Sequence, residues 1–302
     1  LWNFCKRRLV RLQPMVVMGM LLGGALFYFQ GSEIFPNIAQ TPVWKMLLVM
    51  TVGFTLLPVP VSLDIRGWTE MHPLNGPAWS LFFEYIANIL YAVLIRKFTS
   101  RWLAVLVFLA ACALIHQCYT QGNNIGGWTL DVEQCRVGLT RLMFPFFGGL
   151  LLFRLCKPGR VRHGFWWCSL LLVGALAMPH VGGAENFHLN GLYDAFCIIV
   201  IFPAVVFLGA SDIPGDISSR ASRFLGNISY PLYITHYPIV YLYLAWVHDA
   251  EVPFSRALPV AVGVLFICIA VAYGCLKLYD EPVRAWLSKR VLARRAPEQP
   301  RP

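Results

Sequence analysis

Long apolar runs, separated by short polar links, occupy the chain from end to end. About 20 consecutive apolar residues span a bilayer as a helix. The runs are too uniformly apolar for the alternating strands of a membrane barrel, and an open sheet edge has no hydrogen-bond partners in lipid. The pattern therefore predicts an all-α fold, a polytopic transmembrane helix bundle with about eight or nine membrane segments. The candidate segments are 14–31, 43–61, 79–95, 102–118, 139–153, 164–180, 191–209, 229–247 and 257–278.

Composition supports the same class of protein. Hydrophobic residues make up 58% of the chain and charged residues 13%, and the mean hydropathy is +0.60. The links between the apolar runs are too short for a sizeable soluble domain. We therefore expect one integral membrane domain over residues 1–284, followed by a basic tail over 285–302 whose last residues are disordered.

The net charge is +10, and the basic residues behind it are concentrated in some loops and absent from others. Lysines and arginines gather in four stretches, 6–11, 96–101, 154–163 and 277–295. They are absent from three others, 31–42, 119–135 and 181–190. Since basic loops stay on the cytoplasmic side, the basic loops and the C-terminus are expected there. Nucleic acid is not an expected partner, because the charges are scattered among loops instead of gathered on one soluble face.

Counting the segments gives one conflict. Three segments between the first two basic stretches would place those stretches on opposite sides of the membrane, so one of the three is expected not to cross. The best candidate is 43–61, which ends in "LLPVPVS". Pro58 and Pro60 interrupt a helix there, and irregular backbone at membrane depth must lie against protein or a water-filled cavity.

The nine cysteines lie mostly inside apolar segments and show no C-x-x-C spacing, so we interpret them as small buried hydrophobes. No metal-ligand spacing is found, and neither a metal nor a bound cofactor is expected. The chain begins with Leu1 on a basic stretch that already leads into a helix, without a cleavage site for a signal peptide. We therefore expect further residues upstream.

One segment, "LGNISYPLYITHYPIVYL" at 225–242, is unusually polar for its surroundings. A helix starting near Ser229 would place Pro231 in its first turn, with Asn227 or Ser229 as the cap. Pro238 cannot donate to the carbonyl of Ile234, which predicts a bend and an unsatisfied acceptor.

Ser229, Tyr233 and His236 fall on one face of that helix. They fit a hydrogen-bonded contact between helices with a tyrosine belt, or a histidine facing a cavity with hydroxyls beside it. We favour the cavity, because ionisable groups inside a span are costly and usually serve function.

A second polar stripe follows the turn at Asn75. Ser80, Glu84 and Asn88 share one helix face, and Glu84 is the single acid in its segment. It could pair with an arginine of another helix, or act in acid–base chemistry with a proton affinity raised by burial.

Arginines form two further motifs. Arg7, Arg8 and Arg11 are close enough along a helix to converge, which fits either membrane orientation or bidentate binding of phosphates. Near the other end of the chain, Glu281 and Arg284 are spaced for a surface ion pair.

Four stretches together resemble the acyltransferase-3 family of bacterial integral membrane acyltransferases. They are "RRLVRLQP" at 7–14, "WSLFFE" at 79–84, "LGNISYPLYITHYP" at 225–238 and "DEPVR" at 280–284, and they occur in the family's order across nearly the whole chain.

The resemblance implies acyl transfer, often of acetyl, from acyl-CoA as co-substrate to a hydroxyl of a sugar in a cell-surface polysaccharide or glycolipid, at the bacterial inner membrane. It also implies upstream spans that carry an Arg and a His as the catalytic pair. In this chain Glu84 and His236 would orient or replace the base, and Arg7, Arg8 and Arg11 would hold the CoA phosphates. The substrate-binding group comprises Asn75, Trp79, Ser80, Tyr230 and Tyr233, with Trp79 stacking on a sugar ring and the hydroxyls donating hydrogen bonds.

Three alternatives remain. A glycolipid transporter or flippase would also be a basic-inside bundle, but internal repeats would be expected and none is detected. A different donor, such as succinyl-CoA, would use the same chemistry. An inactive, truncated relative of the same fold is the third. The acceptor sugar and the oligomeric state are not indicated by the sequence.

Overall fold

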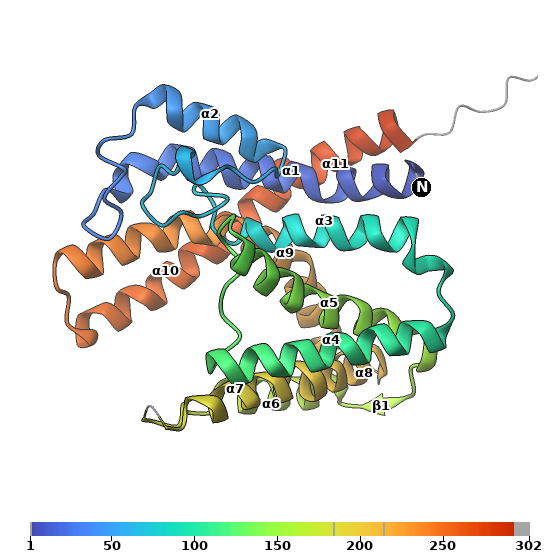
Figure 1. Cartoon of the computed structure of the whole chain (residues 1–302). Coiled ribbons are helices and arrows are strands. Elements are labelled where there is room, and N and C mark those ends of the chain that lie inside the picture. Colours follow the sequence, from blue (N-terminus) through green and yellow to red (C-terminus); the bar gives the residue numbers. More distant parts are fainter. Residues whose placement is uncertain (1, 184, 214, 293–302) are drawn as a thin grey trace, which may run out of the picture. The chain divides into compact units, whose positions relative to one another are not determined.

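The structure, a computed structural model, describes residues 2–183, 185–213 and 215–292 (Figure 1). The last residues of the basic tail, 293–302, lie outside the described residues. The helices are α1 (Trp2–Leu26), α2 (Val43–Phe54), α3 (Ala78–Val93), α4 (Ser100–Gln121), α5 (Val132–Leu155), α6 (Gly164–Leu176), α7 (Phe187–Phe196), α8 (Phe202–Ala210), α9 (Asp216–Asp249), α10 (Phe254–Cys275) and α11 (Glu281–Leu287). Two short strands, β1 (Val161–Arg162) and β2 (Asp212–Ile213), pair in parallel.

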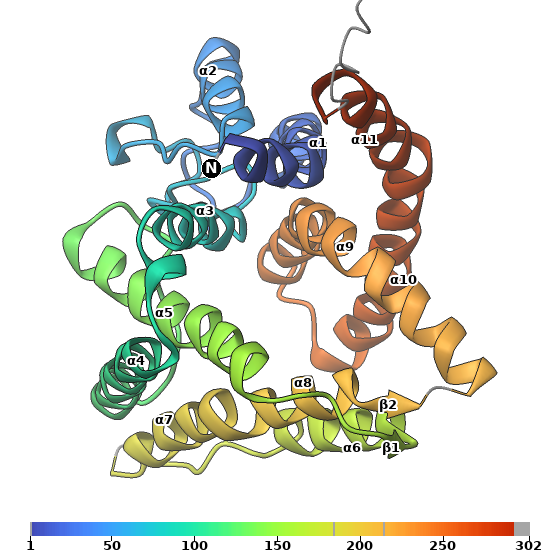
Figure 2. The same ribbon diagram turned by 90° about the vertical axis from the view of Figure 1, so that its right-hand side faces the viewer.

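Contacts divide the chain into two compact units. The first unit contains the described residues up to Trp79 and those from Asn227 onward, and the second contains 80–226. The borders fall inside α3 and α9. Within the first unit, α1 is flanked by α2 and by α11 (Figures 1 and 2). Within the second, α4 packs against α5 and α7, and α6 packs against α8.

The predicted class is confirmed: the chain is an all-α, polytopic membrane bundle. Each of the nine expected segments falls on a helix. Among the described residues, five helical stretches are long and apolar enough to cross a membrane, Phe4–Gln30, Ser100–Gln121, Val132–Leu155, Phe187–Ala210 and Phe254–Leu292. Turns of π-helix join α7 to α8 and α10 to α11, so the last two stretches are continuous.

Helix α2 is shorter than its apolar run. It has 12 residues and ends at Phe54, before Pro58 and Pro60. A helix of that length rises about 18 Å, against about 30 Å of hydrocarbon. The backbone from Thr55 to Pro60 is irregular, as the two prolines predicted.

Helix α9 corrects a predicted boundary. It begins at Asp216, not near Ser229, so Pro231 lies in the helix interior and neither Asn227 nor Ser229 is a cap. The preceding turns are polar and largely exposed, which hid them from a search for apolar runs. Helix formation requires backbone hydrogen bonds, and polar side chains do not prevent it.

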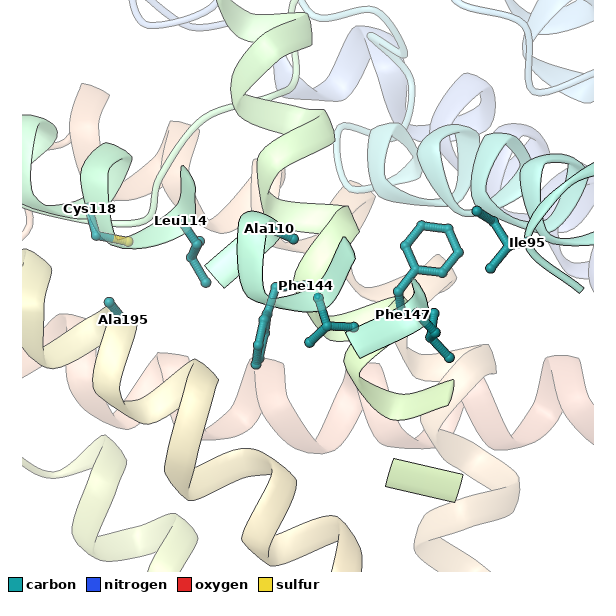
Figure 3. Close-up of a cluster of buried hydrophobic side chains, with 9 residues drawn as sticks. Ile95, Ala110, Leu114, Cys118, Phe144, Phe147 and Ala195 are labelled. Carbon is teal, nitrogen blue, oxygen red and sulfur yellow. The ribbon is translucent and has the colours of Figure 1, made fainter. Parts of the chain in front are cut away.

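The core of the second unit lies along α4. Leu114 and Ala110 of α4 face Phe144 and Phe147 of α5, and Ala195 of α7 packs beside Cys118 (Figure 3). Helices α4 and α7 approach closely because Gly191 of α7 lies directly against the backbone carbonyl of Cys118. A side chain at position 191 would force the two helices apart.

We expect Gly191→Ala to lower the free energy of unfolding by about 1 to 3 kcal/mol, because the new Cβ overpacks a helix contact. Gly174→Ala is the matched control, since nothing lies within 4 Å of a Cβ at that helical position. Alanine there should be neutral or stabilise by about 1 kcal/mol. Thermal unfolding of the two purified variants in detergent checks this, and equal unfolding temperatures would contradict the close contact.

Candidate functional site

A fully buried arginine organises the first unit. Arg66, in the loop between α2 and α3, has no exposed surface. Its Nε donates to the carbonyl of Pro73 at 2.9 Å and its Nη2 donates to Oε1 of Gln30 at 2.9 Å. The guanidinium carbon lies 3.7 Å from the centre of the Tyr241 ring. Because a buried charge is costly unless it is paired, these contacts hold the loop against the end of the first span and against α9.

Glu70 completes this cluster. Its Oε2 lies 3.7 Å from Nε of Arg66, and the hydroxyl of Tyr241 donates to its two oxygens at 2.7 and 2.9 Å. A Cβ at Gly76 would lie 2.5 Å from Glu70 Oε1, so the backbone of the α3 entry packs directly on the carboxyl group. Burial raises the pKa of Glu70 to about 7, against the opposing effects of Arg66 and Tyr241.

Sequence reasoning did not identify Arg66 or Glu70. Both lie in a loop outside the polar stripes, where helical spacing gives no signal. The only sign of their pairing in the sequence was that two residues of opposite charge stand four positions apart.

Two side-chain amides donate to backbone carbonyls of α9 near Pro238. Asn75 Nδ2 donates to the carbonyl of Ile234 at 2.7 Å, and Gln30 Nε2 donates to that of Pro238 at 2.8 Å. The Ile234 carbonyl is the one that Pro238 leaves unsatisfied, so the predicted free acceptor is confirmed and its partner is Asn75. The Oδ1 atom of Asn75 is buried and has no hydrogen-bond partner among the described residues. Its role in substrate binding stays a prediction.

The ring of His236 is fixed on its own helix. Nδ1 lies 3.0 Å from the carbonyl oxygens of Leu232 and of Tyr233. Both are acceptors, so we assign the ring proton to Nδ1, which leaves the lone pair on Nε2. In the part of the chain that the structure describes, Nε2 makes no hydrogen bond. The half-buried ring therefore presents a basic nitrogen away from its helix.

The two predicted tyrosines donate to backbone carbonyls. The hydroxyl of Tyr230 donates to Leu12 at 2.7 Å, and that of Tyr233 donates to Pro77 at 2.6 Å. These bonds tie α9 to α1 and to the start of α3. Trp79 is half-buried in the first turn of α3. The roles of these three residues toward a substrate stay predictions.

The predicted arginines are brought together in part. Arg7 and Arg11 of α1 line one cavity of about 340 Å³, together with residues of α11. Arg8 is not among the lining residues, and its guanidinium lies 5.8 Å from the ring centre of Phe4. The expected Glu281–Arg284 pair is not formed. Glu281 instead pairs with Lys277 at 2.5 Å and Arg284 pairs with Asp280 at 3.0 Å, both at a spacing of four residues.

Ser80 and Glu84 belong to the second unit. Both are half-buried on α3, and the amide of Asn88 donates to the carbonyl of Glu84 at 2.8 Å. The three residues therefore share a helix face as predicted, and the catalytic role of Glu84 stays a prediction.

Comparison with known proteins gives one match. A family model described as an acyltransferase domain matches residues 1–276. The match covers both units. No curated protein and no solved structure was found to match the chain.

The buried cluster predicts an unusual dependence of stability on pH. The folded-state pKa of Glu70, about 7, is above the ordinary value of 4.5, so stability should fall as pH rises through this interval. Glu70→Gln should remove that fall. Thermal unfolding of wild type and variant between about pH 5 and about pH 8 checks this, and parallel curves would contradict it.

His72 should make stability depend on pH in the opposite direction. Burial lowers its pKa to about 4 from the ordinary 6.5, so stability should be lost as pH falls through that interval. His72→Gln should flatten the acid side of the same unfolding profile while leaving the neutral side unchanged. Loss of stability in acid that persists unchanged in the variant would exclude His72 as its source.

Proposed function

The chain belongs to the acyltransferase-3 family, whose domain model covers residues 1–276, and from this membership we propose that it transfers an acyl group, acetyl in the simplest case, from acyl-CoA to a sugar hydroxyl. The proposed acceptor is a sugar of a cell-surface polysaccharide or glycolipid, and the proposed location is the bacterial inner membrane with the basic loops inside. The acyl-CoA is a co-substrate, and the chain needs no bound cofactor in this proposal.

The basic nitrogen of His236 is the observation that carries the proposal. In the reaction, the sugar oxygen attacks the thioester carbon as its proton moves to a base, and the thiolate of CoA leaves as the C–S bond breaks. His236 has Nδ1 protonated against its helix and Nε2 carrying the lone pair. A neutral imidazole held in this tautomer can accept the hydroxyl proton and return it to the leaving thiolate.

The other residues predicted from the sequence suit the remaining steps. Glu84 would orient the base or replace it. Ser80 would donate to the oxyanion that develops on the thioester carbonyl. The hydroxyl protons of Tyr230 and Tyr233 are bound to backbone carbonyls, so these two oxygens would accept hydrogen bonds from the sugar. Trp79 would stack on the sugar ring, and the unsatisfied Oδ1 of Asn75 would accept a hydrogen bond from a sugar hydroxyl.

The donor would be held at the basic end of α1. Arg7 and Arg11 line one cavity, and guanidinium groups bind phosphates with two hydrogen bonds each. Arg8 would add charge at the same end of the helix. The basic end of α1 is also the end that the positive-inside rule places in the cytoplasm, where acyl-CoA is made.

We expect His236→Gln to lower kcat for acyl transfer by about 10² to 10⁴-fold, because a general base is lost, while the affinity for acyl-CoA stays unchanged. The measurement is transfer of labelled acyl groups from acyl-CoA to extracted glycolipid and polysaccharide in membranes that contain the protein. His248→Gln is the matched control on the same helix, since His248 is exposed near its end.

Normal kcat in His236→Gln would place the base elsewhere in the protein. Absence of transfer by the wild type from every acyl-CoA offered would contradict the proposed function itself.

A further inference from the structure

The cavity at the α1–α11 contact contains a third arginine. Arg284 of α11 lines it with Arg7 and Arg11 of α1, and Ser288 contributes a hydroxyl. Helices α1 and α11 lie side by side in both views (Figures 1 and 2). Residues from the two ends of the sequence therefore build one basic cavity in the first unit.

Two acids at the cavity do not cancel its charge. Asp280, whose side chain is only 2% exposed, binds Arg284 through Oδ2 at 3.0 Å, and Glu281, which also lines the cavity, is paired with Lys277. Neither Arg7 nor Arg11 forms an ion pair with any residue that the structure describes. The two arginines of α1 thus give the cavity a net positive charge. Asp280 restricts the position of the third guanidinium, that of Arg284.

Helix length places this cavity near a membrane surface. The helical stretch Phe254–Leu292 has 39 residues. It rises about 58 Å, whereas the hydrocarbon of a bilayer is about 30 Å thick. The apolar part is α10, so the charged α11 continues beyond the hydrocarbon. The arginines of α1 lie at the same level because they line the same cavity.

We infer that Arg284, together with Arg7 and Arg11, forms a binding site for a phosphate-bearing ligand, and that Asp280 positions Arg284 within it. A cavity of about 340 Å³ is small for a ligand site, which suits one phosphate-bearing end of a ligand and not a whole coenzyme. Three arginines from two helices match a group with two or more negative charges.

The identity of the ligand rests on the proposed function. For an acyltransferase, the ligand with this chemistry is the phosphorylated nucleotide end of acyl-CoA. Arg284 would then distinguish CoA from donors that carry only the pantetheine portion. A phospholipid headgroup offers related chemistry at the same membrane surface, and the experiment separates the two.

The test is equilibrium binding to the purified full chain in neutral detergent, with five probes: CoA, pantetheine, 3′,5′-ADP, inorganic pyrophosphate and detergent-solubilised phosphatidylglycerol. We expect Arg284→Gln to weaken the binding of CoA and of 3′,5′-ADP by about 10 to 100-fold, as for loss of a charge-assisted hydrogen bond, and to leave the binding of pantetheine unchanged. Asp280→Asn should weaken the binding of CoA by a smaller factor. Arg290→Gln is the matched control, because Arg290 lies over the ring of Trp286 and does not line the cavity.

Two controls separate a loss of binding from a loss of folding. They are the charge-conserving variant Arg284→Lys and the unfolding temperature of each variant. A folded Arg284→Gln protein that binds CoA as tightly as the wild type would overturn the site. Binding of pyrophosphate that depends on Arg284, without binding of CoA, would support the site and contradict the acyl-CoA donor. If Arg284→Gln instead weakens only the binding of phosphatidylglycerol, the ligand is a lipid headgroup and the assignment to CoA is wrong.

Discussion

Burial of the Arg66 guanidinium is the constraint on which the first unit depends. A charge without exposed surface must be paired and hydrogen-bonded, and removing one partner of such a pair typically costs about 3 to 5 kcal/mol. The partners of Arg66 come from three parts of the chain: Gln30 at the end of the first span, Glu70 and Pro73 in its own loop, and Tyr241 on α9. The loop between α2 and α3 is therefore a fixed part of the structure, although it has almost no regular backbone.

This constraint reaches the candidate site through α9. Pro238 removes a backbone donor from α9, and the carbonyl of Ile234 that it frees would be costly without a partner. Asn75 binds the carbonyl of Ile234, and Gln30, itself bound to Arg66, binds that of Pro238. Side chains outside the helix thus bind its backbone at both of these points. His236 lies between these two points, and its ring is held by the carbonyls of its own preceding turn.

The sequence predicted those features that depend on local pattern. Apolar runs identified every membrane helix, and Pro238 identified the carbonyl that needed a partner. Neither could locate Arg66 or Glu70, because their burial results from segments that are distant in the sequence. The start of α9 was missed since its first turns are polar, and the partner of Arg284 was wrong because two acids of the same helix compete for it. The convergence of Arg284 with Arg7 and Arg11 depends on packing between the two ends of the chain, for which one sequence gives no signal.

The central claim is that the ring of His236 carries a proton on Nδ1 and presents the lone pair of Nε2. Nitrogen NMR of the protein labelled with ¹⁵N-histidine, with His236 assigned by comparison with His236→Gln, tests it most directly. The account predicts a proton on Nδ1 and a lone pair on Nε2. A tautomer with the proton on Nε2 and the lone pair on Nδ1 would contradict it.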